Sequence, residues 1–253
     1  MTLPAWGERA AAHAGALSLL TARAFAALVR PPYAGREWLR QMEQIGVRSF
    51  GVAAVTTIFT GMVLALQTAY SLPELGVKYY IGTMVAKSLV RELGPVLTAL
   101  IVGGRIGSGM TAELGTMRVT EQIDALRSMG ADPVKKLVVP KLAATLVMLP
   151  VLTVIGDLLG ILGGMVIAVL QLKLTAGFYM NDVLQALTLD DLSSGIGKSI
   201  FFAVCIAIVG CYNGLNARGG ADGVGRATTN TVVMAAIMVL VSDFFLTKLF
   251  YIL

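Results

Sequence analysis

The chain is organised by long apolar runs that alternate with short polar segments. Five runs are long enough to cross a bilayer, which takes roughly 20 residues of α-helix. The predicted spans cover residues 50–70, 79–105, 137–172, 196–215 and 228–250. The first of them contains no charged residue. The pattern therefore predicts an all-α, polytopic membrane protein with five transmembrane helices.

The first 48 residues follow a different pattern. Residues 8–30 are mostly Ala, Leu, Phe and Val, and their basic side chains fall within an arc of about 100° on a helix. These side chains are Arg9, His13, Arg23 and Arg30. A basic helix with an apolar face tends to lie in the headgroup plane instead of crossing the membrane. We expect residues 1–48 to form an N-terminal amphipathic, interfacial segment and residues 49–253 to form one membrane domain.

Composition excludes a soluble fold. Of the 253 residues, 56% are hydrophobic and 14% charged, against about 25% charged in a typical soluble domain. The net charge of +5 is best explained by cytoplasmic loops, which collect Lys and Arg, and no nucleic-acid partner is expected. With the N-terminus inside, the inner segments 1–49, 105–141 and 217–226 hold 14 of the 20 basic residues, and the outer ones hold four. This asymmetry predicts an N-inside, C-outside topology.

Motifs for catalysis or metal binding do not occur in the sequence. Cys205 and Cys211 lie in an apolar run, and His13 is the one histidine, so no Cys/His cluster can form. Residues 195–199 (GIGKS) end like a phosphate-binding loop, but Leu192 stands where its first glycine would be. We expect a chain that is not an enzyme, holds no metal and binds no cofactor of its own.

Three charges interrupt the second predicted span. Lys87, Arg91 and Glu92 lie near its middle, where each charge costs roughly 2.5–3.5 kcal/mol on insertion scales. Pro95 removes the hydrogen bond to the Arg91 carbonyl and leaves an acceptor beside the charges. A polar substrate cavity would satisfy these groups, and Gln67 of the first span could line the same space. The alternative is a buried ion pair that locks two helices together.

The polar segment between spans two and three predicts a short amphipathic helix at about 113–130. Thr120 is a candidate cap for it. A helix too polar to cross either lies on the membrane or docks onto a partner, and its spacing leaves both open. Its charged residues are Glu113, Arg118, Glu121, Asp124 and Arg127.

Glycines recur at spacing four in three of the spans. They are Gly103 and Gly107, then Gly156, Gly160 and Gly164, then Gly210 and Gly214. Such stripes let helix backbones approach closely in lipid. They indicate either helix packing within one subunit or a subunit interface.

Two stretches of the sequence resemble the MlaE/YrbE family. The first covers residues 91–144, beginning RELGPVLTALIVGGRIGSG, and the second covers residues 217–233, ARGGADGVGRATTNTVV. Members of this family are permease subunits of bacterial ABC transporters that work with MCE-domain proteins on lipids. The resemblance extends from about residue 43 to the C-terminus.

The resemblance implies a homodimer in the bacterial inner membrane, with an interfacial helix and five spans in each subunit. Two separate ATPase subunits, which bind the ATP and Mg²⁺, would contact the coupling helix at 113–130. A periplasmic MCE-domain hexamer and, in some systems, a STAS-domain protein complete the assembly. The substrate class is phospholipid, and the transport serves outer-membrane lipid asymmetry.

The resemblance also implies which residues meet the substrate. Arg91 and Glu92 match second-span positions that reach the cavity between the permeases, with Gln67 from span one. Lys87 joins them by its position alone, because it lies outside the matching motif. The same mid-membrane charges are also consistent with a different class of function, an ion-coupled secondary transporter that would use them to carry its coupling ion.

Overall fold

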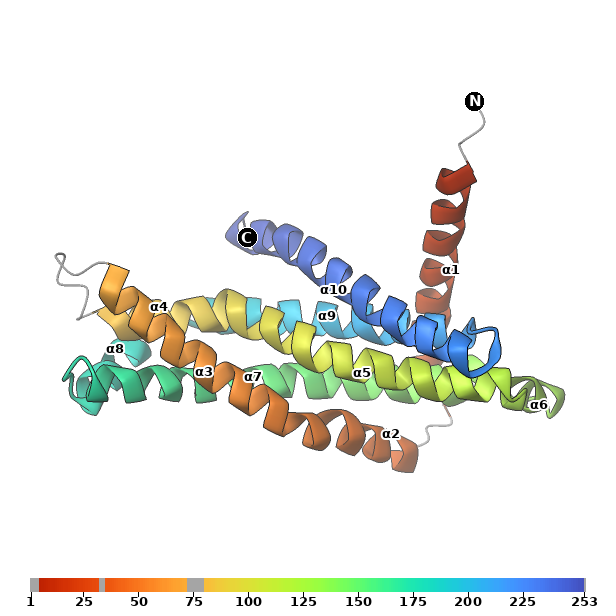
Figure 1. Ribbon diagram of the computed structural model, residues 1–253, viewed down its shortest axis with the longest axis horizontal. Helices are drawn as coiled ribbons and strands as arrows, with labels where there is room; N and C mark the ends of the chain where they lie inside the picture. Colours follow the sequence, from red (N-terminus) through yellow and green to blue (C-terminus); the bar gives the residue numbers. More distant parts are fainter. Residues whose placement is uncertain (1–4, 32–34, 72–79, 253) are drawn as a thin grey trace.

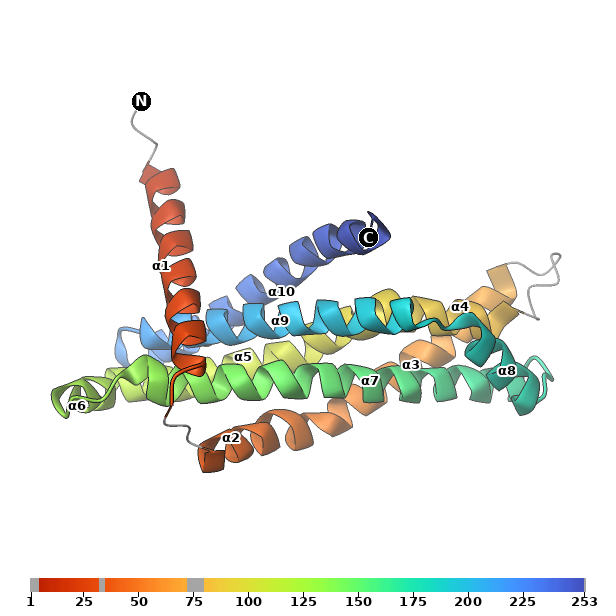
Figure 2. The ribbon, with the colours of Figure 1, turned by 180° about the vertical axis from the view of Figure 1, so that it is seen from behind.

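The protein is a bundle of long helices. The computed structural model describes residues 5–31, 35–71 and 80–252, and the described chain is helical with no strand. Figure 1 shows the long helices running side by side, and Figure 2 shows the same arrangement from behind. The helical paths of the bundle are α3 (Arg48–Ser71), α4 (Ile81–Ser88) continued by the π-helical turn η3 (Leu89–Leu93) and α5 (Gly94–Val119), α7 (Val139–Leu170), α9 (Leu189–Leu215) and α10 (Gly220–Ile252).

The N-terminal helix α1 (Ala5–Leu28) stands apart from this bundle. In both ribbon views it projects across the direction of the long helices, as an interfacial helix would. Its link to the bundle includes His13, whose Nδ1 lies 2.8 Å from the Tyr212 hydroxyl of α9. Direction, and not composition, separates α1 from the spans, because the stretch Ala11–Leu28 is itself long and apolar enough to cross.

The second predicted span differs from α1 in both respects: it lies within the bundle, but it is not among the segments that are apolar enough to cross. Four bundle segments are long and apolar enough to cross a membrane, and they are Gly35–Tyr70, Val134–Leu170, Leu189–Leu215 and Gly220–Phe250. The path α4–η3–α5 is not in that set, and it carries Lys87, Arg91 and Glu92. It nevertheless packs along α3, α7, α9 and α10. The protein is therefore all-α, with five membrane-crossing paths and an N-terminal helix.

Glycines allow the closest helix contacts. A Cβ on Gly61 of α3 would lie 1.8 Å from the Gly160 carbonyl oxygen of α7. A Cβ on Gly210 of α9 would lie 3.0 Å from the Gly107 carbonyl oxygen of α5. The glycines at spacing four thus pack helices within one chain, which confirms the first of the two interpretations offered by the sequence.

Two polar segments outside the long helices are themselves helical. The segment before α3 forms α2 (Gly35–Met42) and the π-helical turn η1 (Glu43–Val47). After α7, the chain forms α8 (Ala176–Ala186), which begins where the Thr175 hydroxyl accepts a bond from the Phe178 N–H. Asp182 ties α8 to α4, because its carboxylate accepts bonds from the Thr83 N–H and hydroxyl at 2.8 and 2.6 Å. The connection between the first two predicted spans, residues 72–79, lies outside the described residues.

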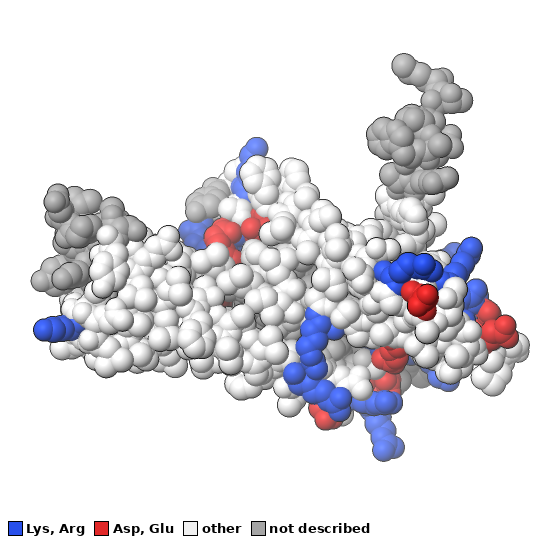
Figure 3. All heavy atoms as spheres, in the orientation of Figure 1, with Lys and Arg blue, Asp and Glu red and all other residues white. Residues whose placement is uncertain are grey.

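Charged side chains gather at one end of the bundle. Figure 3 shows blue and red atoms concentrated around α6 (Gln122–Ser128), the start of α10 and the α2 side of the molecule. The long middle surface is nearly all uncharged, with one small charged group beneath the C-terminal half of α10. An uncharged middle flanked by a charged end is the surface that a bilayer requires.

Candidate functional site

A buried lysine joins three helical segments near the break in the second span. Lys198 of α9 is fully buried. Its Nζ donates to Glu92 Oε2 at 2.5 Å and to Thr247 Oγ1 at 2.7 Å, and it lies 3.2 Å from Asp243 Oδ1. We call Glu92, Lys198, Asp243 and Thr247 the buried cluster after its lysine, although the side chains of Glu92 and Asp243 remain 34% and 21% exposed. Since two carboxylates surround one ammonium, the charge of Lys198 is fully compensated within the protein.

The same lysine resolves the backbone defect made by Pro95. Proline has no N–H, so the Arg91 carbonyl loses its normal helical donor. Lys198 Nζ donates to that carbonyl oxygen at 3.1 Å. The helix accommodates the defect as the π-helical turn η3, and such turns are frequent at functional sites. A side chain, and not a hydrated cavity, therefore supplies the missing donor.

Arg91 faces a different environment from its neighbour Glu92. Arg91 Nη1 lies 3.2 Å from Asp191 Oδ1 at the start of α9, and about a quarter of the arginine side chain is exposed. Asp191 is itself held by a capping box with Thr188. A polar cavity of about 560 Å³ opens beside this pair, and it is lined by Lys87, Arg91, Thr188, Asp190, Asp191, Ser193, Ser194 and Phe250.

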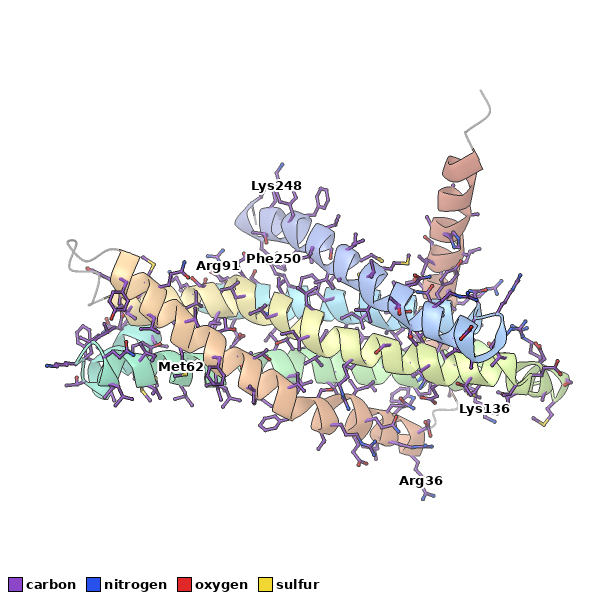
Figure 4. The ribbon with its side chains drawn as sticks, viewed as in Figure 1. Arg36, Met62, Arg91, Lys136, Lys248 and Phe250 are labelled. Atoms are coloured by element: carbon purple, nitrogen blue, oxygen red, sulfur yellow. The ribbon has the colours of Figure 1, made fainter. Side chains whose placement is uncertain are left out.

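An apolar groove lies between α9 and α10, further along both helices from the polar cavity. It measures about 420 Å³ and is formed by one face each of α9 and α10: Phe201, Cys205, Ile237, Met238, Val241, Ser242, Phe245 and Leu246. Leu246 in this groove and Phe250 in the polar cavity are one helical turn apart on α10, about 6 Å along the axis. Figure 4 shows Arg91 and Phe250 near one another, between η3 and the end of α10.

The predicted substrate residues divide among these places. Lys87 and Arg91 line the polar cavity, whereas Glu92 pairs across helices in the buried cluster. Gln67 is exposed on α3 and is not among the residues lining the cavity. The two interpretations of the charges thus apply to different residues, an interhelical lock for Glu92 and a cavity for Arg91 and Lys87.

The predicted coupling segment has a different construction from the single helix expected at 113–130. Glu113 and Arg118 belong to α5, which ends at Val119, and Thr120 closes that helix instead of capping the next one. Glu121 then takes a left-handed conformation (φ 61°) and α6 follows. Arg118 Nη1 bonds Asp124 Oδ2 at 2.7 Å, and Arg127 Nη1 bonds Asp124 Oδ1 at 3.1 Å. These contacts fold the segment into a compact, exposed tip.

Known proteins match nearly the whole chain. The model of the Permease MlaE family matches residues 38–249. The chain belongs to the MlaE permease family. It is 42% identical to a probable ABC transporter permease protein of Rickettsia conorii, over 94% of this chain and 92% of the relative. It is 35% identical to the intermembrane phospholipid transport system permease protein MlaE of Haemophilus influenzae, over 90% of this chain and 88% of that protein.

A plant relative extends this range. The chloroplastic protein TRIGALACTOSYLDIACYLGLYCEROL 1 of Arabidopsis thaliana is 37% identical over 85% of this chain and 62% of its own length. Membership of the MlaE family makes the chain a membrane permease, a transport component instead of an enzyme. It favours an ABC permease over the ion-coupled secondary transporter that the mid-membrane charges left open.

Three members of the buried cluster are not evident from the sequence pattern of this MlaE-family chain. Lys198 belongs to residues 195–199, which end like a phosphate-binding loop at the start of the fourth predicted span. Asp243 is the one acid of the fifth predicted span, and Thr247 carries no signal of its own. The cost of a mid-span carboxylate was the available clue, because such a group needs a partner inside the protein.

We predict that Lys198→Met destabilises the protein strongly, because it leaves Glu92 and Asp243 without their cation. Breaking a fully buried ion pair costs about 3–5 kcal/mol, and we expect a smaller loss here because Glu92 and Asp243 are partly exposed. Adding Glu92→Gln to that variant removes one stranded charge and should recover a large part of the loss. Thermal unfolding of the detergent-solubilised protein measures both effects. Lys248→Met, at an exposed lysine on α10, is the matched control and should melt like the wild type. Equal stability of Lys198→Met and wild type would contradict the role assigned to the cluster.

Proposed function

We propose that this permease moves phospholipid between the bacterial inner membrane and a periplasmic MCE-domain protein, driven by ATP hydrolysis in separate subunits. One observation carries the proposal: a polar cavity and an apolar groove follow one another along α9 and α10, with Phe250 lining the cavity and Leu246, one helical turn away, lining the groove. A phospholipid needs both, since its headgroup is charged and its acyl chains are apolar. The phospholipid transport named for the Haemophilus influenzae relative supports the same substrate class.

Arg91 is the residue that meets the lipid phosphate. Its ion pair with Asp191, at 3.2 Å, is longer than the roughly 2.7–2.9 Å of a tight charge-assisted hydrogen bond. A phosphate entering the cavity can replace Asp191 as the partner of the guanidinium, which suits bidentate phosphate binding. Lys87 adds a second positive charge to the same wall. Glu92 does not repel the headgroup, because Lys198 holds it in the buried cluster.

Membership of the MlaE family supports the remaining parts of this proposal. Two copies of the chain form the membrane dimer, and two ATPase subunits bind the ATP and Mg²⁺ on the cytoplasmic side. The tip made by residues 113–130 contacts the ATPases, with a STAS-domain protein as a further cytoplasmic partner in some systems. Closure of the ATPases moves the tip and, through α5, the helices that line the lipid site. The exposed position of Glu121 and Asp124 on this tip supports its role in docking.

We predict that Arg91→Ala reduces lipid transfer at least tenfold while the complex still assembles. The physical reason is loss of the phosphate ligand from the cavity wall. Arg91→Lys keeps the charge but not the forked donors, so it should retain part of the activity. Transfer of labelled phospholipid from proteoliposomes to the isolated MCE-domain protein measures the rate, with Lys248→Ala as the control. Wild-type transfer by Arg91→Ala would remove the headgroup role, and failure to assemble would make Arg91 a structural lock.

We predict that Glu121→Lys uncouples ATP hydrolysis from lipid transfer. The Glu121 side chain is exposed at the tip. Glutamate and lysine are similarly disfavoured in the left-handed backbone conformation of this position, so we expect the substitution to keep the fold. Reversing its charge should disturb an ATPase contact and lower the lipid transferred per ATP hydrolysed by at least fivefold. Glu43→Lys, another exposed acid outside the tip, is the control. An unchanged ratio of lipid to ATP would contradict docking through this residue.

A further inference from the structure

A second polar pocket lies at the other end of the bundle from the lipid site. It measures about 570 Å³ and is bordered by the η1–α3 elbow, α5, the start of α7 and the start of α10. Its charged lining residues are Arg48, Arg105, Lys141 and Glu113. We call it the basic pocket. Arg91 and Arg105 lie on one helical path, about 20 Å apart along its axis at 1.5 Å per residue, so the two sites are separate.

The charges of the basic pocket do not balance. Lys141 is only 2% exposed, and its Nζ lies 2.6 Å from Glu113 Oε2. It also donates to Gln41 Oε1 at 3.4 Å. This pair uses the single carboxylate of the lining. Within the described residues, no carboxylate lies at ion-pair distance from Arg48 or Arg105. The pocket therefore holds two uncompensated positive charges.

One of the two arginines is fixed in place. Arg105 Nη1 donates to the Ser49 hydroxyl at 2.6 Å, which ties the α5 residue to the start of α3. A guanidinium has five N–H donors, so the others remain available to a ligand. Arg48 is the first residue of α3, and its exposed side chain lines the same pocket. The two guanidiniums can thus hold one anion from two helices.

The pocket lies at the level where lipid headgroups are expected. Arg105 ends the second predicted span, and Thr228, another lining residue, begins the fifth. Both positions mark the cytoplasmic boundary in the predicted topology. Ile45, Ile106 and Met110 give the same pocket an apolar side. Basic pockets between membrane helices on the cytoplasmic side bind anionic headgroups, and arginine forks match phosphate oxygens.

We propose that the basic pocket binds an anionic phospholipid of the cytoplasmic leaflet, with its phosphate between Arg48 and Arg105. This is a resident lipid, distinct from the transported lipid at Arg91. It depends on the predicted orientation of the bundle and not on the direction or mechanism of transport. A soluble anion such as inorganic phosphate shares the same chemistry, and the experiment separates it from a lipid.

The test places a reporter in the pocket. Ser108 lines it, partly exposed on α5, and Ser108→Cys reports access through its rate of alkylation by N-ethylmaleimide, an uncharged reagent. The full-length chain, purified with its accompanying subunits, is placed in nanodiscs of phosphatidylcholine or of phosphatidylcholine with phosphatidylglycerol. Ala221→Cys, exposed at the start of α10 outside both the pocket and the 113–130 tip, normalises for the bilayer. We expect phosphatidylglycerol to slow alkylation of Ser108→Cys at least fivefold and inorganic phosphate to have little effect.

Variants assign the protection to the two arginines. Arg48→Gln with Arg105→Gln should abolish it, whereas Arg36→Gln, at an arginine that points away from the bundle in Figure 4, should keep it. Should the double variant fail to fold, Arg48→Gln alone keeps the Arg105–Ser49 bond and is expected to lose at least half of the protection. Arg91→Ala should leave it unchanged. Equal rates in the two bilayers, slow alkylation in both, or equal protection by inorganic phosphate would each overturn the proposal.

Discussion

An ammonium group that is cut off from water must find every partner inside the protein, and Lys198 finds its partners on two other helical segments. It binds Glu92 and the Arg91 carbonyl of η3, together with Thr247 and Asp243 of α10. Leaving any of these charges unpaired in the membrane would cost several kcal/mol. The position of α9 relative to η3 and α10 is therefore restricted to arrangements that keep this cluster intact.

The fixed position of Glu92 explains why the neighbouring residues Arg91 and Glu92 have different roles. Successive side chains on a helix point in different directions, so Glu92 faces Lys198 in the middle of the bundle while Arg91 faces Asp191 at the start of α9 and the polar cavity. The π-helical turn and Pro95 make this possible, since they free a carbonyl that Lys198 then satisfies. The buried cluster thus holds a cationic wall in place beside an apolar groove, which is the arrangement that phospholipid binding needs.

Much of this architecture could be predicted from the sequence, because apolar runs and basic loops respond directly to the bilayer. A separate N-terminal helix could be predicted from the change of pattern before residue 48, and the defect at Pro95 followed from the missing N–H. The partner of that defect could not be predicted, since Lys198 lies 107 residues from Arg91 and only the tertiary fold brings them together. The break between α5 and α6 could not be predicted for another reason. Thr120 is a good helix cap by composition, but the chain turns at Glu121 through a left-handed conformation that the sequence pattern does not reveal.

The most direct measurement is photo-crosslinking with a phospholipid that carries a diazirine on its acyl chain, followed by mapping of the labelled residues. We expect the labels to be concentrated on the facing stretches 201–205 and 237–246 of α9 and α10, and to be reduced by excess unlabelled phospholipid. Labels spread evenly over the lipid-facing helices, with no competition at the groove, would contradict the claim that this groove holds the transported lipid.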